Sequence, residues 1–330
     1  MLIGAGRIKE LVQVNAAAPN VPLISGKWLT AILAASALLV VVMLLRSGLF
    51  VAPDNRGFAA TLAAMVSLIV LRVWVNQPVG LNQTKLRDFS EDVLAFLTIS
   101  LLGVLASYSD AAATSGYSDA TLAHFDTMLH FDWLVWYREV AAHSVLQHLG
   151  EAAYSAIYVS PIVLIGYFVV TQQRARSRQF LATFWLGVVI TLALFPLFPA
   201  EGPLAYLWHG PIPYMPTSAL YQEQLIPALR MHRVTDIDLG ALRGLVCAPS
   251  FHTVSGVIYI AAAWPVRRLR WPILAINAAM LLATPIEGTH YLSDMIAGLV
   301  VALFAIGVVW LGLQAMLASS AERAGPLPTM

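Results

Sequence analysis

The chain has 330 residues, of which 59% are hydrophobic and only 11% are charged, and its formal net charge is +1. A soluble domain carries about 25% charged residues, so this composition excludes an ordinary soluble domain. Together with a mean hydropathy of +0.74, it indicates a polytopic membrane protein. The balanced charge gives no sign of nucleic-acid binding, and the single cysteine, Cys247, excludes an intrachain disulfide.

Apolar runs alternate with polar loops along the chain. After a short tail, residues 1–27, each run is near the roughly 20 residues needed to cross a bilayer. The runs predict an all-α fold, a polytopic membrane helical bundle with about eight transmembrane helices. They cover about residues 28–51, 57–75, 90–108, 148–171, 178–199, 246–264, 271–287 and 289–315.

Basic residues gather in alternate loops, which sets the predicted orientation. Excess Lys and Arg mark cytoplasmic loops. Both termini are therefore expected in the cytoplasm, and the loops 109–147 and 200–245 and the tight link near residue 288 are expected outside. The basic residues that carry this argument are Lys85, Arg87, Arg174, Arg176, Arg178, Arg267, Arg268 and Arg270.

The two long outer loops each have a distinctive composition. Residues 118–137 mix acids with aromatics, which predicts an amphipathic helix in the membrane interface, with Trp133, Trp136 and Tyr137 as anchors. The second loop is rich in proline, which excludes regular structure up to about residue 217 and leaves two interpretations, a lid or a structured connector. Its prolines include Pro203, Pro211, Pro213 and Pro216.

The sixth apolar run opens with Pro249-Ser250-Phe251-His252. A helix N-terminus presents unpaired N–H groups and the positive end of the helix dipole, which suits a phosphate group. Ser250 fits the N-cap position, and its hydroxyl can also bond a phosphate oxygen. The alternative is an ordinary helix start with an interfacial histidine, because short motifs often match by chance.

The last run opens with His290 and Asp294, four residues apart, so on a helix they share one face. An aspartate one turn into an apolar helix is costly in a bilayer unless it is paired or faces water. A carboxylate bonded to one imidazole nitrogen makes the other nitrogen a better nucleophile. The alternative is a hydrogen bond that only joins helices.

Taken together, the two motifs resemble the type 2 phosphatidic acid phosphatase superfamily. Pro249-Ser250-Phe251-His252 is similar to its second signature motif, Pro-Ser-Gly-His, and His290-Tyr-Leu-Ser-Asp294 to the His-x-x-x-Asp of its third. Residues 198–203 are similar to a stretch in the branch related to inositol phosphorylceramide synthase. The organisation that the resemblance implies is a cytoplasmic tail (1–27), two additional transmembrane helices (28–88), a six-helix phosphatase-like catalytic core (89–316) and a C-terminal tail (317–330).

The match is incomplete in the residues that would bind the phosphate. The arginine that usually stands six residues before the third-motif histidine is Thr284 here, and the first motif, Lys-x6-Arg-Pro, is absent. A cationic partner is therefore sought among the outer-loop arginines. Arg243 is the first candidate, and Arg230 and Arg233 follow unless they pair with nearby acids.

The resemblance implies a two-step reaction through a phosphohistidine, with no metal and no cofactor. His290 attacks phosphorus, His252 protonates the departing lipid oxygen, and Asp294 orients His290 and offsets its developing charge. The expected partners are a lipid phosphate substrate and the bilayer, with no nucleic acid.

Phosphate binding and the choice of acceptor involve further residues. Ser250, the N–H groups near Phe251 and Arg243 are implied to bind the phosphate oxygens. Water as acceptor would make the chain a lipid phosphate phosphatase, and an alcohol would make it a head-group phosphotransferase. We rank hydrolysis first, because transfer needs a specific acceptor pocket. Glu287 either holds an acceptor hydroxyl, pairs with an arginine or is a plain boundary charge.

Two interpretations from other classes use the same side chains. His252, His290 and Asp294 could bind zinc in a membrane hydrolase similar to alkaline ceramidases. The second interpretation is a transporter with a His–Asp proton relay. Charged residues within the spans near the inner face would favour it, and apart from Arg72 few such residues are evident. The expected location is a bacterial inner membrane, with the active site facing the periplasm or the extracellular side.

Overall fold

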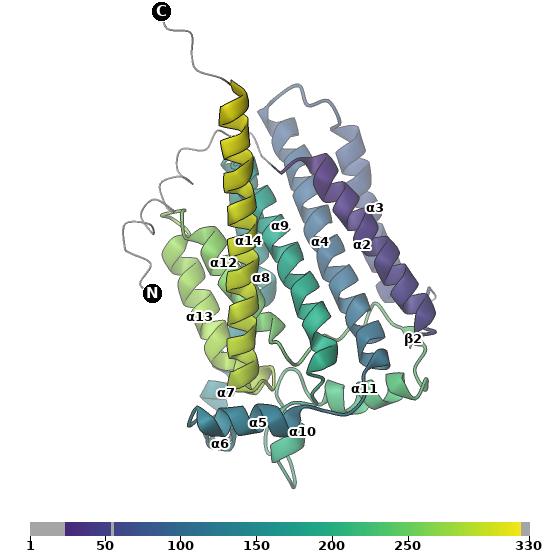
Figure 1. Cartoon of the computed structure of the whole chain (residues 1–330), viewed down its shortest axis with the longest axis vertical. Coiled ribbons are helices and arrows are strands. Elements are labelled where there is room, and N and C mark those ends of the chain that lie inside the picture. Colours follow the sequence, from purple (N-terminus) through teal and green to yellow (C-terminus); the bar gives the residue numbers. More distant parts are fainter. Residues whose placement is uncertain (1–23, 54–55, 325–330) are drawn as a thin grey trace, which may run out of the picture.

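The computed structural model describes residues 24–53 and 56–324, and most of them form a bundle of long helices (Figure 1). Successive long helices run in opposite directions, which suits a chain that crosses a membrane repeatedly. The elements are α2 (Gly26–Arg46), β1 (Phe50–Val51), α3 (Arg56–Trp74), α4 (Leu81–Ala113), α5 (Asp119–Met128), α6 (Trp133–Ala142), α7 (Ser144–Tyr154), α8 (Ala156–Val170), α9 (Arg174–Leu194), η1 (Phe195–Leu197), α10 (Pro203–Leu207), α11 (Tyr221–Arg230), β2 (Asp236–Ile237), α12 (Phe251–Ala263), α13 (Arg270–Glu287) and α14 (Leu292–Ala324).

The predicted all-α polytopic bundle is confirmed. Six stretches of the described chain are long and apolar enough to cross a membrane, namely α2, α3, α4, the α7–α8 pair, α9 with η1, and α14. The other two of the eight predicted crossings are α12 and α13. The 13 residues of α12 fall short of the roughly 20 that span a bilayer, and α13 begins and ends on charged residues.

Short helices gather at one end of the bundle, which we call the site end. Here α5, α6, α10 and α11 lie across the ends of the long helices, at the bottom of Figure 1. Both α12 and α14 begin at this end, so Ser250 and Asp294 are brought to it from two different helices. The tight link after α13 carries His290 to the same end.

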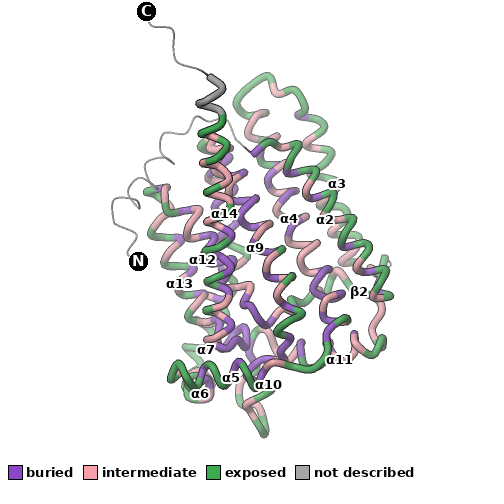
Figure 2. Tube along the Cα trace, viewed as in Figure 1, coloured by how far each residue is buried: buried purple, intermediate pink, exposed green. Residues whose placement is uncertain are grey.

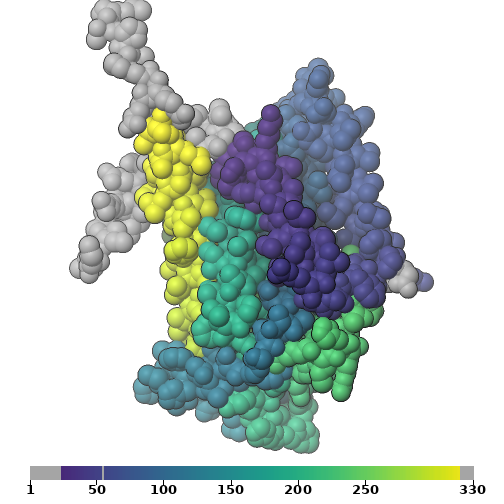
Figure 3. Space-filling model, turned by 45° about the vertical axis from the view of Figure 1, so that its right-hand side comes forward, coloured from purple at the N-terminus to yellow at the C-terminus, as the bar shows by residue number. Residues whose placement is uncertain are grey.

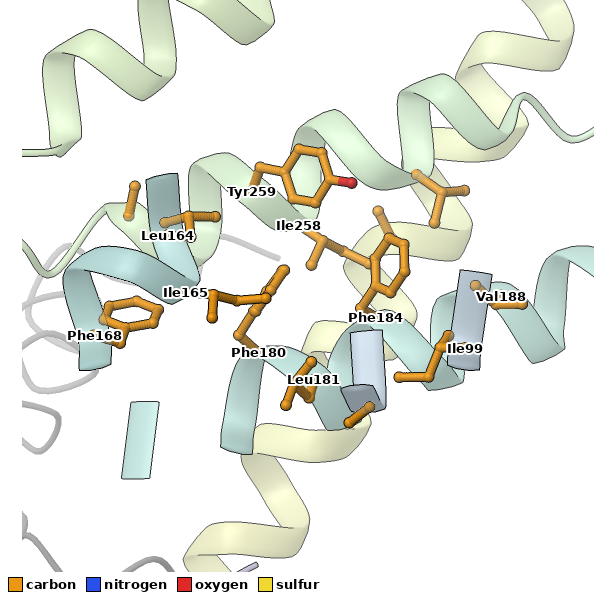
Figure 4. Packing of buried hydrophobic residues seen from close by; sticks show 14 of the residues in the cluster. Ile99, Leu164, Ile165, Phe168, Phe180, Leu181, Phe184, Val188, Ile258 and Tyr259 are labelled. Atoms are coloured by element: carbon orange, nitrogen blue, oxygen red, sulfur yellow. The ribbon is translucent and has the colours of Figure 1, made fainter. Parts of the chain in front are cut away.

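The core forms where α8, α9 and α12 meet (Figure 4). Phe180 and Phe184 of α9 pack against Tyr259 of α12, and the Phe184 and Tyr259 rings stack with their centroids 6.0 Å apart. Burial runs along the inner sides of these helices, whereas the outer sides of α2 and α3 stay exposed (Figure 2). Burial of these aromatic groups fixes the position of α12, whose first turn carries His252.

The two additional helices are joined to the site end through their connecting segment. Leu49 precedes β1 and is buried in a cluster with Ile237 and Leu245, and β1 pairs in parallel with β2. No side chain fits where the backbone of Gly57 meets Gly240. Figure 3 shows α2 beside α9, with α11 below it. The loop that leads to Pro249 is therefore held by the N-terminal helices.

Two predictions about the outer loops are wrong. Residues 118–137 form two helices joined by a turn, because the α5 helix ends at Met128 and α6 begins at Trp133. Trp133 and Tyr137 are buried rather than interfacial: Trp133 Nε1 donates to the Pro285 carbonyl at 2.7 Å, and Tyr137 donates to a loop carbonyl. The proline-rich loop also contains a regular turn of helix, α10, which starts at Pro203 where a missing N–H does no harm.

Candidate active site

The first turn of α12 is built by Ser250. Its side chain accepts a hydrogen bond from Thr253 N at 3.4 Å, and its own N–H donates to the Asp294 carbonyl at 3.1 Å. Gly298 permits this contact, because a Cβ there would lie 2.5 Å from the Ser250 carbonyl oxygen. Ser250 Oγ satisfies one N–H group of this turn, that of Thr253, and the N–H groups of Phe251 and His252 have no acceptor within the helix.

His290 lies just before α14 rather than on it, yet it meets the aspartate of the first turn. His290 Nδ1 is 3.0 Å from Asp294 Oδ1, and Asp294 Oδ2 accepts from Tyr291 N at 2.9 Å. Both side chains are buried, with His290 3% exposed. The carboxylate fixes the ring orientation, and with a proton on Nδ1 it leaves the lone pair on Nε2.

His252 lies on the facing turn of α12 and is half-buried. Its ring centroid is 6.0 Å from that of His290. Tyr154 stacks on His252 at a centroid distance of 4.1 Å, and its hydroxyl is 3.2 Å from His252 Nδ1. In the described part of the chain, Nε2 of neither histidine has a hydrogen-bond partner, so both are free to face a reacting group.

Two aspartates of α5 support the segment that carries His290, and the sequence analysis did not single them out. Asp126 caps α14: its two oxygens accept from Leu292 N and Ser293 N at 2.9 and 2.7 Å. The Ser293 hydroxyl donates back to the Leu122 carbonyl of α5. Because these bonds join residues about 170 positions apart, no local pattern could reveal them.

Asp119 lies two turns before Asp126 on the same face of α5. It binds the start of the proline-rich loop and the residue after His290. It accepts from the N–H groups of Glu201 and Gly202, both at 3.0 Å, and from the Tyr291 hydroxyl at 2.9 Å. Burial raises the pKa of Asp119 above its ordinary value, and these three donors lower it in part. The only available signal was the seven-residue spacing of Asp119 and Asp126, which places two acids on one helical face.

Glu287 is buried and has a structural environment different from those foreseen. Its oxygens accept from the Tyr214 hydroxyl at 2.8 Å and from Thr217 N and Oγ1 at 3.0 and 2.7 Å. Its backbone carbonyl accepts from Ser218 N. In the described residues Glu287 pairs with no arginine; it fastens the proline-rich loop onto the link before His290.

The three candidate arginines lie in different environments. Arg230 donates twice to Thr114 Oγ1, at 3.2 and 2.8 Å, and is held there. The Arg243 guanidinium lies 4.2 Å from the centroid of the Tyr221 ring, and Arg233 is exposed. Within the described residues none of the three forms an ion pair, so the pairing with nearby acids is not seen.

Cys247, His290 and Asp294 form the one group of three in the described chain whose ligand atoms could meet a metal ion, with those atoms within 4.8 Å of one another. His252, which the zinc interpretation required, is not in this group. Burial and the neighbouring Asp294 raise the pKa of the Cys247 thiol well above its ordinary value. The thiol donates to Asp294 Oδ2 at 3.8 Å.

The helical membrane bundle and its paired histidines define a class of integral membrane proteins with a buried His–His–Asp cluster. The model of the PAP2 superfamily matches residues 120–308, more than half of the chain, and this chain belongs to that superfamily. Its members are phosphatases and phosphotransferases, so the chain is an enzyme of that general kind. No curated protein and no solved structure matches the chain.

Proposed function

We propose that the chain is a membrane phosphatase that hydrolyses a lipid phosphate ester through a phosphohistidine on His290, with residues 89–316 as the catalytic core. The observation that carries this proposal is the placement of His290 Nδ1 at 3.0 Å from Asp294, with the His252 ring 6.0 Å away. A nucleophile oriented by a carboxylate and a second histidine within reach are the parts that phosphoryl transfer needs.

In the first step, His290 Nε2 attacks phosphorus and the P–O bond to the lipid breaks. His252 gives a proton to the departing lipid oxygen, and Asp294 stabilises the positive charge on His290. In the second step, water loses a proton to His252 while its oxygen bonds to phosphorus. The N–P bond breaks, inorganic phosphate leaves, and His290 and His252 return to their starting states.

Tyr154 gives His252 the proton arrangement that the first step needs. In the first step His252 is the imidazolium, with a proton on each nitrogen. Nδ1–H donates to the Tyr154 hydroxyl oxygen, and Nε2–H faces the leaving group and is transferred to it. Ser250 and the N–H groups at Phe251 and His252 bind the equatorial oxygens. Arg243 is the candidate cation, since Arg230 is held by Thr114.

We infer a lipid substrate in the outer leaflet, because the motifs lie at the end opposite the basic loops. In this orientation both termini are cytoplasmic. Hydrolysis is placed ahead of alcohol transfer because Glu287, which the sequence offered as a holder of an acceptor hydroxyl, already accepts from Tyr214 and Thr217.

The test uses purified protein and phosphatidate labelled in its phosphate, with and without polyol and lipid alcohols. We expect labelled inorganic phosphate alone, and acid-labile, alkali-stable label on the wild type but not on His290→Ala. Label on an added alcohol would replace hydrolysis by transfer. Inhibition by chelators but not by vanadate would overturn the phosphohistidine in favour of zinc hydrolysis, and solute flux without turnover would indicate a transporter.

A further inference from the structure

An apolar cavity lies beside the candidate active site, and the reaction described above does not use it. It has a volume of about 410 Å³ and lies between α6, α7 and α13, which is within the range of small-molecule sites. Most of its lining is apolar, including Trp136 of α6, Leu149 and Ala153 of α7, and Leu282 of α13. Glu139 and Glu287 supply the only carboxylates of the lining.

The cavity extends from the site end into the membrane-spanning part of the bundle. Its lining on α13 runs from Glu287 back to Ala279, eight residues or about 12 Å along the helix. Leu149 and Leu282 are exposed at its sides, and Leu149 belongs to the Ser144–Val170 candidate span. The cavity therefore opens toward hydrocarbon, where its natural occupant is a hydrocarbon chain.

Two lining positions connect the cavity with the two histidines. Ala153 precedes Tyr154, which stacks on His252. Glu287 precedes Gly288, where a Cβ would lie 2.6 Å from His290 Cδ2 and 2.9 Å from the Tyr154 hydroxyl. Gly150 allows Glu287 to lie at this boundary, because a Cβ there would be 2.9 Å from Glu287 Oε1.

The charges at the cavity also set the direction in which a lipid would lie. The phosphate group is anionic, and a carboxylate repels it, so Glu287 and Glu139 disfavour entry of the phosphate into the cavity. The unpaired N–H groups of the first α12 turn attract it instead. A lipid phosphate would then place its phosphate at the histidines and a chain along α7 and α13.

We propose that this cavity binds one hydrocarbon chain of the lipid phosphate substrate and sets the preference for chain length. This inference rests on the proposed function for its activity measurements. The competing occupant is an ordinary bilayer lipid, which would fill the same cavity without any relation to turnover.

The experiment compares Ala279→Phe, which fills the cavity, with Ala275→Phe as control. Both alanines are exposed on α13 about one turn apart, and only Ala279 lines the cavity. Release of phosphate is measured in detergent micelles from dioleoyl and dihexanoyl phosphatidate. We expect Ala279→Phe to lower kcat/KM about tenfold for the long-chain substrate, the effect of losing burial of about two methylene groups, and to leave the short-chain substrate and the control unchanged.

The outcomes separate the two proposals. Equal rates for the long-chain substrate in both variants, or an equal loss for both substrates, would overturn the cavity assignment and leave the phosphatase intact. Failure of the wild type to hydrolyse either substrate would overturn the proposed function. In that case phosphatidate with a photoactivatable chain still tests the cavity: labelling of α7 and α13 that dioleoyl phosphatidate displaces supports it, and labelling that dioleoyl phosphatidylcholine displaces equally contradicts it.

Discussion

The two ends of the bundle each bury a cluster of polar side chains, but the clusters differ in how their groups are paired. At the end opposite the site, Glu91 of α4 accepts from Arg72 of α3 at 2.6 Å and from both Arg174 and Arg178 of α9. Ser177 donates to Asp92 at 2.6 Å. Four arginines and three acids form ion pairs there, so most of their charge is offset within the cluster: Arg72, Arg87, Arg174, Arg178, Asp88, Glu91 and Asp92.

At the site end the histidines have fewer partners. His290 has a single carboxylate, Asp294, and His252 has a single hydroxyl, Tyr154. One nitrogen of each ring has no partner among the described residues. Opposite charges that pair across helices hold those helices together, whereas a histidine pair with an unengaged nitrogen on each ring can take part in proton transfer and nucleophilic attack.

The largest effect should come from the carboxylate of the site end. Asp294→Asn cannot hold the His290 proton on Nδ1, so kcat should fall by roughly 10³–10⁴-fold, as for other histidines that lose such a partner. Phosphate release from phosphatidate measures it. Asp92→Asn, the matched change at the opposite end, should keep the wild-type kcat per folded molecule; an equal loss in both variants would remove the distinction between the clusters.

His252→Ala should have the next largest effect, and its size should depend on the leaving group. Loss of a general acid costs roughly 10²–10⁴-fold for a lipid alkoxide, which needs the proton. Nitrophenolate needs far less help, so the first-turnover burst of nitrophenolate from nitrophenyl phosphate should keep close to the wild-type rate. Complete turnover of both substrates should slow, because water still loses its proton to His252. The ratio of the two first-turnover rates is the measurement, and a uniform loss of that rate for both substrates would assign His252 to binding instead.

The sequence predicted those parts of the molecule that are local in the chain. Hydropathy located the helices, and the four-residue spacing of His290 and Asp294 predicted a pair that the structure places 3.0 Å apart. The sequence could not predict that Asp126 caps α14 or that Glu287 binds the proline-rich loop, because these contacts join segments that are distant in the chain. Trp133 was misplaced for the same reason: an aromatic at an interface and one beneath a loop look alike in sequence.

The charged residues at the end opposite the site show a second limit of prediction from sequence. The predicted apolar run began at residue 90, whereas α4 begins at Leu81. Asp88 was therefore placed outside the helix, and Glu91 and Asp92, at the start of the run, were not singled out as charges within the bundle. The transporter interpretation was set aside because few such charges were evident. Their mutual pairing with arginines now gives a physical reason for their presence that needs no transport.

Arg178→Met should change stability rather than activity. Arg178 is buried and contacts both Glu91 and Asp92, and removing one partner of a buried pair costs about 3–5 kcal/mol because it leaves the other charge uncompensated. Thermal unfolding in detergent should show a lower Tm, with unchanged kcat per folded molecule at low temperature. Arg87→Met is the control and should change Tm much less, because Arg87 pairs with Asp88 in the same cluster but is more exposed than Arg178.

The smallest change in activity that distinguishes the histidine cluster from the ion-pair cluster is expected from Tyr154→Phe. The phenylalanine keeps the stack on His252 and removes only the hydroxyl at 3.2 Å, a hydrogen bond of about 0.5–1.5 kcal/mol. The phosphatidate rate should fall by roughly tenfold or less, and the pH profile should shift, because the imidazolium form of His252 loses its hydrogen-bond acceptor at Nδ1. The first-turnover burst from nitrophenyl phosphate, which does not need the proton of His252, should show neither change. A loss that is equal for both substrates, with a fixed pH profile, would mean that Tyr154 only supports packing, and the two histidines would then be oriented by Asp294 and the helix starts alone.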